Sequence, residues 1–201
     1  MKNITLSLAG VLLFSFAYAQ KPVLKSGTFS GLKGQSELNV EFDYSALKVG
    51  SGKKAKTEAD YTAEKVKEHN EKEAGKGDKW LEGWNSAPDK RYKPKFFELL
   101  NDGLKKSGVT AGEGKSGAKY TLVVKTTRIE PGVNVAVYKV PASADMVYEL
   151  KEGGTVVGVV EILNSPGSQF SGYDFDAGTR IAESYAKSAK TLAGYIAKQL
   201  K

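Results

Sequence analysis

The sequence predicts an α+β domain with a mostly antiparallel sheet of about five strands, helices inserted after the first strand, and a long C-terminal helix packed on the sheet. Three observations predict this order. Apolar and polar residues alternate with period two at residues 37–44 and again in runs between 119 and 163. Residues 45–118 contain no convincing strand and include three stretches of helical character. An alanine-rich stretch at 177–200 has the apolar stripe of an amphipathic helix.

The first 19 residues have the three parts of an export signal. A positive charge at Lys2 precedes an apolar stretch at 4–16, and Ala17 and Ala19 form a small-x-small cleavage site. The alternative, an uncleaved membrane anchor, is disfavoured because a span needs about 20 apolar residues. The sequence therefore predicts a leader at 1–19, a single domain at 20–201, and a protein that is periplasmic or associated with the cell envelope.

The composition excludes several kinds of chemistry. The 201 residues include no cysteine and a single histidine, His69, which leaves no disulfide, thiolate metal site or cysteine nucleophile. The formal net charge is +7, but only Arg91, Arg128 and Arg180 of the 30 basic residues are arginine. Lysine is a poor group for bidentate base or phosphate recognition, so no specific nucleic-acid partner is expected. Weak binding of a polyanion through lysine remains an alternative.

The N-terminal part is expected to begin with an extended lead-in, residues 20–36, that holds one short edge strand. The following strand, 37–44, places Leu38, Val40, Phe42 and Tyr44 on its buried face.

Three helices are expected next. The first covers residues 57–73 and is largely exposed. The second carries Trp80 and Trp84 at i and i+4 and is expected to stop before Pro88. The third opens with Pro94 in its first turn and closes at Gly108, a typical C-terminal residue.

The C-terminal half is expected to form the remaining strands and the last helix. Residues 120–129 are apolar on both faces, as in a central strand. The pair Gly153–Gly154 separates two alternating runs and indicates a hairpin. In the last helix, Leu192 and Ile196 are expected to face the sheet, beside a stripe of alanines that lets the helix lie close to it.

The densest aromatic cluster is the candidate ligand site. Trp80, Trp84 and Tyr92 lie within 13 residues of one another, followed by Phe96. Such rings stack on sugars or on peptide side chains, and the alternative is that they pack the helices on the sheet.

The best acidic pair is Asp174 and Asp176, just before the last helix. Two carboxylates can act as acid and base on a glycan or hold Ca²⁺, but both also stand where a helix N-cap belongs, and capping is the preferred interpretation. The glycine-rich run at 108–116 has the wrong spacing and the wrong flanking elements for a phosphate-binding loop, so a connecting loop is expected there.

Residues 42–45, 75–80, 120–132 and 172–187 together resemble a family of small exported proteins of Bacteroides-like bacteria, to which no activity is assigned. The resemblance covers most of the mature chain and implies export and a single domain. It implies no catalytic residues. More loosely, the order of elements is similar to envelope accessory proteins with a strand–helix–sheet–helix layout.

The leading functional hypothesis is a non-catalytic accessory or binding protein of the periplasm or cell envelope, with an envelope protein or glycan as partner. No cofactor, metal or catalytic residue is predicted, nor a transmembrane segment once the leader is removed. A carboxylate-based hydrolase of envelope glycans is the first alternative, and the polyanion binder is the second.

Overall fold

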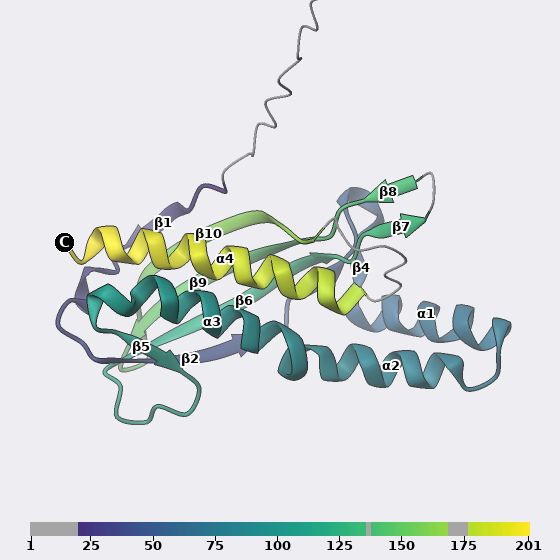
Figure 1. Ribbon diagram of the computed structural model, residues 1–201, viewed down its shortest axis with the longest axis horizontal. Coiled ribbons are helices and arrows are strands. Elements are labelled where there is room, and N and C mark those ends of the chain that lie inside the picture. Colours follow the sequence, from purple (N-terminus) through teal and green to yellow (C-terminus); the bar gives the residue numbers. More distant parts are fainter. Residues whose placement is uncertain (1–19, 136–137, 169–176) are drawn as a thin grey trace, which may run out of the picture.

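The computed structural model describes residues 20–135, 138–168 and 177–201 (Figure 1). Its strands are β1 (Val23–Gly27), β2 (Glu37–Asp43), β3 (Lys48–Val49), β4 (Lys56–Thr57), β5 (Thr110–Gly112), β6 (Tyr120–Glu130), β7 (Val133–Val135), β8 (Tyr138–Val140), β9 (Ser143–Glu152) and β10 (Thr155–Pro166). Its helices are α1 (Glu58–Lys72), α2 (Lys76–Ala87), α3 (Lys93–Leu104) and α4 (Ala177–Gln199), with 3₁₀ turns at Ser30–Leu32, Gly52–Lys54 and Lys105–Ser107 and a π-helical turn at Pro88–Tyr92. The predicted α+β class and the long C-terminal helix are confirmed.

The sheet differs from the expected one in both size and direction. It is a mixed sheet of eight strands in the order β1-β10-β9-β6-β2-β5, with β3 and β4 attached beside β6. Strand β2 runs parallel to both β5 and β6, whereas β6, β9, β10 and β1 are successively antiparallel. The prediction of a mostly antiparallel sheet of about five strands is therefore wrong. Parallel neighbours need a long crossover, and the three helices between β2 and β6 supply it.

The three short strands β3, β4 and β5 lie in the region that showed no convincing strand in the sequence. Each is only two or three residues long, which is too short for a period-two pattern to be recognised. Strands β3 and β5 pair with the longer strands β6 and β2, and β4 pairs with β3.

Helices α3 and α4 lie side by side on one face of the sheet, while α1 and α2 form a hairpin that extends beyond its end (Figure 1). The strands send alternate side chains into the layer beneath α3 and α4. These inward residues are almost fully buried: Leu38, Val40, Leu122, Val124, Met146, Tyr148, Leu150, Val160 and Ile162. The opposite face carries paired charges, as in the 2.7 Å contact between Lys125 and Glu149. The sheet is thus packed on one face and polar on the other.

Several local predictions are confirmed. Thr57 caps α1 by accepting a hydrogen bond from the Asp60 amide at 3.1 Å, and α1 has no buried residue. Gly153 and Gly154 have φ values of 52° and 87°, as a two-residue β9–β10 hairpin turn of left-handed geometry requires. Strand β1 is the expected short edge strand.

Helix α2 ends at Ala87, directly before Pro88, as expected, but the helical path continues beyond it. The Pro88 φ of −53° and ψ of −52° are helical, and the chain continues through the π-helical turn into α3. Proline removes an amide donor and its ring crowds the carbonyl of the preceding turn; a widened π turn accommodates both effects.

The alanine face of α4 packs partly against α3 rather than only against the sheet. A Cβ atom added at Gly103 of α3 would lie 2.5 Å from Cβ of Ala193. Ala182, Ala186 and Ala189 are buried as well. The stripe therefore serves a close helix–helix contact, which the sequence alone had placed at the sheet.

This contact predicts energetic coupling between positions 103 and 193. Gly103→Ala introduces a methyl group that collides with the Ala193 side chain, so Ala193→Gly is expected to be less damaging in that background than in the parent protein. The expected coupling energy is about 0.5–3 kcal/mol from a double-mutant cycle of urea melts. Strict additivity of the two changes would contradict the close α3–α4 contact.

Hydroxyl groups satisfy one another in the buried layer between α4 and the strands. The Thr126 and Tyr185 hydroxyls are 2.8 Å apart, and those of Tyr148 and Ser188 are 2.6 Å apart. The Ser165 hydroxyl donates to the Ser184 carbonyl oxygen at 2.6 Å. These bonds fix the register of α4 on the sheet, because a buried polar group left unpaired is costly.

Candidate functional site

The predicted aromatic residues do not form one patch. Trp80 and Trp84 lie on the α2 face that meets α1, and their rings stack with centroids 5.6 Å apart. The Tyr61 ring of α1 lies with its centroid 5.2 Å from that of Trp84, and the His69 ring stacks on Trp80 with centroids 5.7 Å apart. Most of this cluster is therefore the packing between two antiparallel helices, which the i, i+4 spacing of the tryptophans makes possible.

His69 lies within 57–73, the helix that was expected from the sequence to be largely exposed. It is half-buried because its ring covers Trp80. Within the described residues, no group of three or more histidine and acidic side chains has the arrangement of a metal site.

Tyr92 lies at the end of the π-helical turn, where it is 2% exposed. Its ring stacks on Tyr185 of α4, with centroids 4.9 Å apart and planes inclined by 15°. Tyr92 thus fastens the α2–α3 junction to α4, and it stands apart from the Trp80–His69 pair.

Trp84 and Tyr92 nevertheless meet at a cavity of ≈140 Å³ near the base of the helical hairpin. The wall consists of three aromatic rings, three apolar side chains and two polar ones: Tyr44, Trp84, Tyr92, Leu47, Pro88, Ile129, Glu58 and Asn85. Four separate parts of the chain supply these residues: the β2–β3 segment, the start of α1, the α2–α3 junction and the end of β6. The structure therefore brings two of the three predicted ligand residues, Trp84 and Tyr92, to one cavity.

Glu58 is the charged residue among those that line the cavity. It lies in the first turn of α1, and its Oε1 accepts a hydrogen bond from the Trp84 indole N–H at 2.8 Å. In the part of the chain that the structure describes, no lysine or arginine forms an ion pair with Glu58. A neutral donor orients this carboxylate and leaves its charge uncompensated.

The phenols of Tyr44, which lines the cavity, and Tyr61, which packs against Trp84, stay neutral at ordinary pH. Burial raises the pKa of Tyr44 to about 12, and the buried Tyr44 hydroxyl has no partner at hydrogen-bonding distance in the described chain, although Tyr185 lies nearby. Burial likewise raises the pKa of Tyr61, which packs behind Trp84, to about 12. The wall is thus aromatic and uncharged apart from Glu58.

A second, more open hollow of ≈500 Å³ lies beside β2 and the loop that follows β5. Its lining includes Glu41 and Glu113. Lys115 of the glycine-rich run is paired with Glu37 at 2.7 Å, and its backbone amide donates to Asn39 at 3.1 Å. These contacts agree with the expected connecting loop and supply no cradle for a phosphate.

Asp174 and Asp176, the acidic pair singled out in the sequence, lie outside the described residues. Their alternative roles as helix caps or as a functional pair stay predictions.

Sequence reasoning missed Glu58 and Tyr44 as site residues. Tyr44 was predicted only as part of the buried face of its strand, and Glu58 was not singled out. No local pattern links them to Trp84, because the chain segments that carry them meet only in the folded protein.

Comparisons with known proteins show no family for this chain. No protein-family model matches it, and a search of curated proteins finds no match. Among solved structures it is similar to the PelC dodecamer from Paraburkholderia phytofirmans, with 14% identity over 90% of this chain and 96% of that one and a TM-score of 0.38. A single-substitution variant of the same dodecamer gives 14% identity, 90% and 98% coverage and a TM-score of 0.38. A similarity at this level supports no functional argument.

Proposed function

We propose that this protein is a non-catalytic accessory or binding protein, exported to the periplasm or cell envelope, and that its ligand site is the cavity formed by Tyr44, Glu58, Trp84 and Tyr92. The single observation that supports the binding role is this cavity, which joins an aromatic wall to one uncompensated carboxylate. Ligand sites are commonly concave and mostly apolar, with a few polar groups that set orientation. Export rests on the leader-like residues 1–19.

The described part of the chain also contains no helix with the length and hydropathy needed to cross a membrane.

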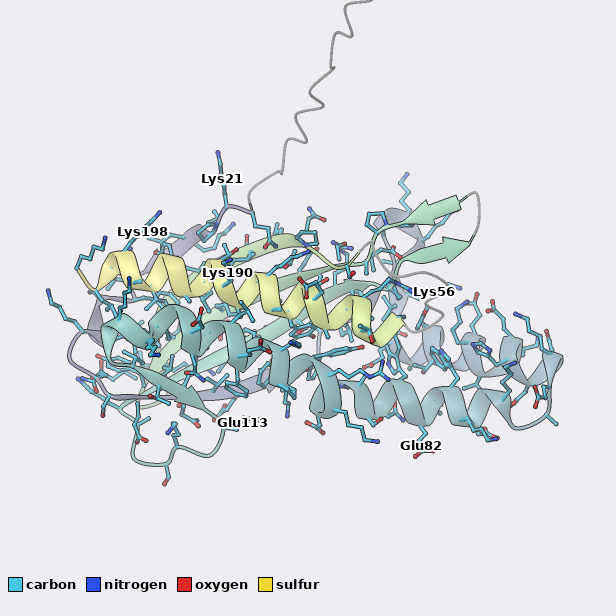
Figure 2. The ribbon with its side chains drawn as sticks, viewed as in Figure 1. Lys21, Lys56, Glu82, Glu113, Lys190 and Lys198 are labelled. Carbon is cyan, nitrogen blue, oxygen red and sulfur yellow. The ribbon has the colours of Figure 1, made fainter. Side chains whose placement is uncertain are left out.

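The surface charges offer less support for polyanion binding. The lysines labelled in Figure 2 do not form one cluster: Lys21 precedes β1, Lys56 lies on β4 and is paired with Glu64, and Lys190 and Lys198 lie on α4. Many other lysines are already paired with acids, as in Lys25–Glu161 and Lys119–Glu152. A polyanion site would instead concentrate unpaired basic groups on one face.

The proposal is tested by blocking the cavity. Asn85 lines it but is exposed, so Asn85→Phe can place a ring at the cavity without overpacking the core. Three probes of similar shape are titrated: choline, the uncharged isostere dimethylbutanol, in which a carbon replaces the nitrogen, and the anion pivalate. Fluorescence of Trp80 and Trp84, the two tryptophans of the chain, reports binding. At least one probe is expected to bind saturably to the parent protein and not to Asn85→Phe.

The matched control is Glu82→Phe, which adds the same ring on α2 at an exposed position that does not line the cavity (Figure 2). This variant is expected to bind like the parent. If no probe binds to the parent protein, or if Asn85→Phe binds as well as the control, the cavity is not the ligand site.

A further inference from the structure

We propose that the cavity binds the methylated ammonium group of a small organic cation. This inference rests on the proposed function and deepens it, because it names the chemical class of the ligand.

The first support is the aromatic wall. Trp84, Tyr92 and Tyr44 border the same small volume, and the electron-rich faces of such rings attract a cation that lies within about 6 Å of them. Trp84 and Tyr92 are each stacked on a second ring, Trp80 and Tyr185 respectively. The wall is therefore rigid before any ligand arrives, which lowers the entropic cost of binding.

The second support is the charge balance. Glu58 is half-buried at the cavity, and its described contacts include the Trp84 indole but no cationic group. The nearby Lys93 is already held by Asp89 at 2.8 Å and Glu113 at 2.9 Å. A bound cation would therefore compensate the carboxylate that the protein leaves without a counter-charge.

The third support is the size and the lining of the cavity. A cavity of about 150 Å³ accepts a molecule as large as benzene, and this cavity of ≈140 Å³ is close to that size. Most of the lining is apolar or aromatic, with Leu47, Pro88 and Ile129 beside the three rings, and Glu58 is its only charged residue among those described. A methylated ammonium gains from such apolar contact.

The experiment compares choline with dimethylbutanol, because the two differ in charge but hardly in shape. Binding is measured by tryptophan fluorescence and by calorimetry on the whole chain. Choline is expected to bind about tenfold or more tightly than dimethylbutanol, and pivalate is not expected to bind. Equal affinities for choline and dimethylbutanol would overturn the cation inference while leaving the cavity as a binding site.

Glu58→Gln separates charge from shape. The glutamine carbonyl can still accept the indole hydrogen bond, so the wall is preserved while the negative charge is lost. The preference for choline over dimethylbutanol is expected to fall about tenfold, with the affinity for dimethylbutanol unchanged. The control is Glu71→Gln, which removes an exposed charge from the other end of α1 and should keep the parent preference. An unchanged preference in Glu58→Gln would refute the role of this carboxylate.

Discussion

Leu192→Ala is expected to lower the free energy of unfolding by about 2–5 kcal/mol. Leu192 is fully buried in the contact between α4 and the rest of the core, where Ile181 and Ile196 are fully buried too. Removing its side chain loses apolar burial and leaves a cavity that a rigid helix, pinned by the Tyr148–Ser188 and Thr126–Tyr185 hydroxyl pairs, cannot close by moving. Urea denaturation of the parent and the variant measures the difference.

Leu163→Ala provides the matched control, because the same atoms are removed from a side chain of β10 that is 48% exposed. Its expected effect is under about 1 kcal/mol. A loss below roughly 0.5 kcal/mol for Leu192→Ala would show that α4 is peripheral to the core, contrary to the fold described above.

The protein is also expected to lose stability steeply as the pH rises above about 10. In the folded state burial raises the pKa of Tyr44 and of Tyr61 to about 12, and it raises the pKa of Tyr148 and of Tyr185 as well. Unfolded tyrosines titrate near pH 10. Between these values the unfolded chain releases protons that the folded chain keeps, so ionisation favours unfolding.

The stabilisation by each phenol is therefore fully present below about pH 10 and is lost as the pH rises towards 12. In that window each phenol lowers the free energy of unfolding by up to about 1.4 kcal/mol per pH unit. At pH 11 Tyr44 and Tyr61 together lower it by roughly 3 kcal/mol. Urea melts at successive pH values measure the loss, and ultraviolet absorbance follows the phenolates.

Tyr61→Phe tests the assignment to particular rings. Within the described part of the chain, the Tyr61 hydroxyl makes no hydrogen bond, and its ring packs on Trp80 and Trp84, so phenylalanine keeps the packing. At pH 11 the free energy of unfolding of the variant is expected to exceed that of the parent by about 1.4 kcal/mol, and at pH 8 the two are expected to be similar. Identical pH profiles for the two proteins would show that Tyr61 does not contribute.

The candidate site was only partly predictable. The sequence drew attention to Trp84 and Tyr92 because aromatic residues are dense there, and both line the cavity. The density of aromatic residues does not show which partners they contact. Trp80 packs between α1 and α2, and Glu58, which gives the cavity its charge, was not singled out from the sequence. Such contacts depend on long-range packing, which residue spacing does not encode.

Local patterns were sufficient to predict α3, α4 and the β9–β10 hairpin, because period, caps and turn glycines act between residues that are near in sequence. The direction of β2 against β6, the continuation of the helix through Pro88, the Gly103–Ala193 contact and the cavity all depend on segments far apart in the chain. Their energies depend on shape complementarity between surfaces that exist only after the elements have formed, so they follow from the packed three-dimensional structure alone.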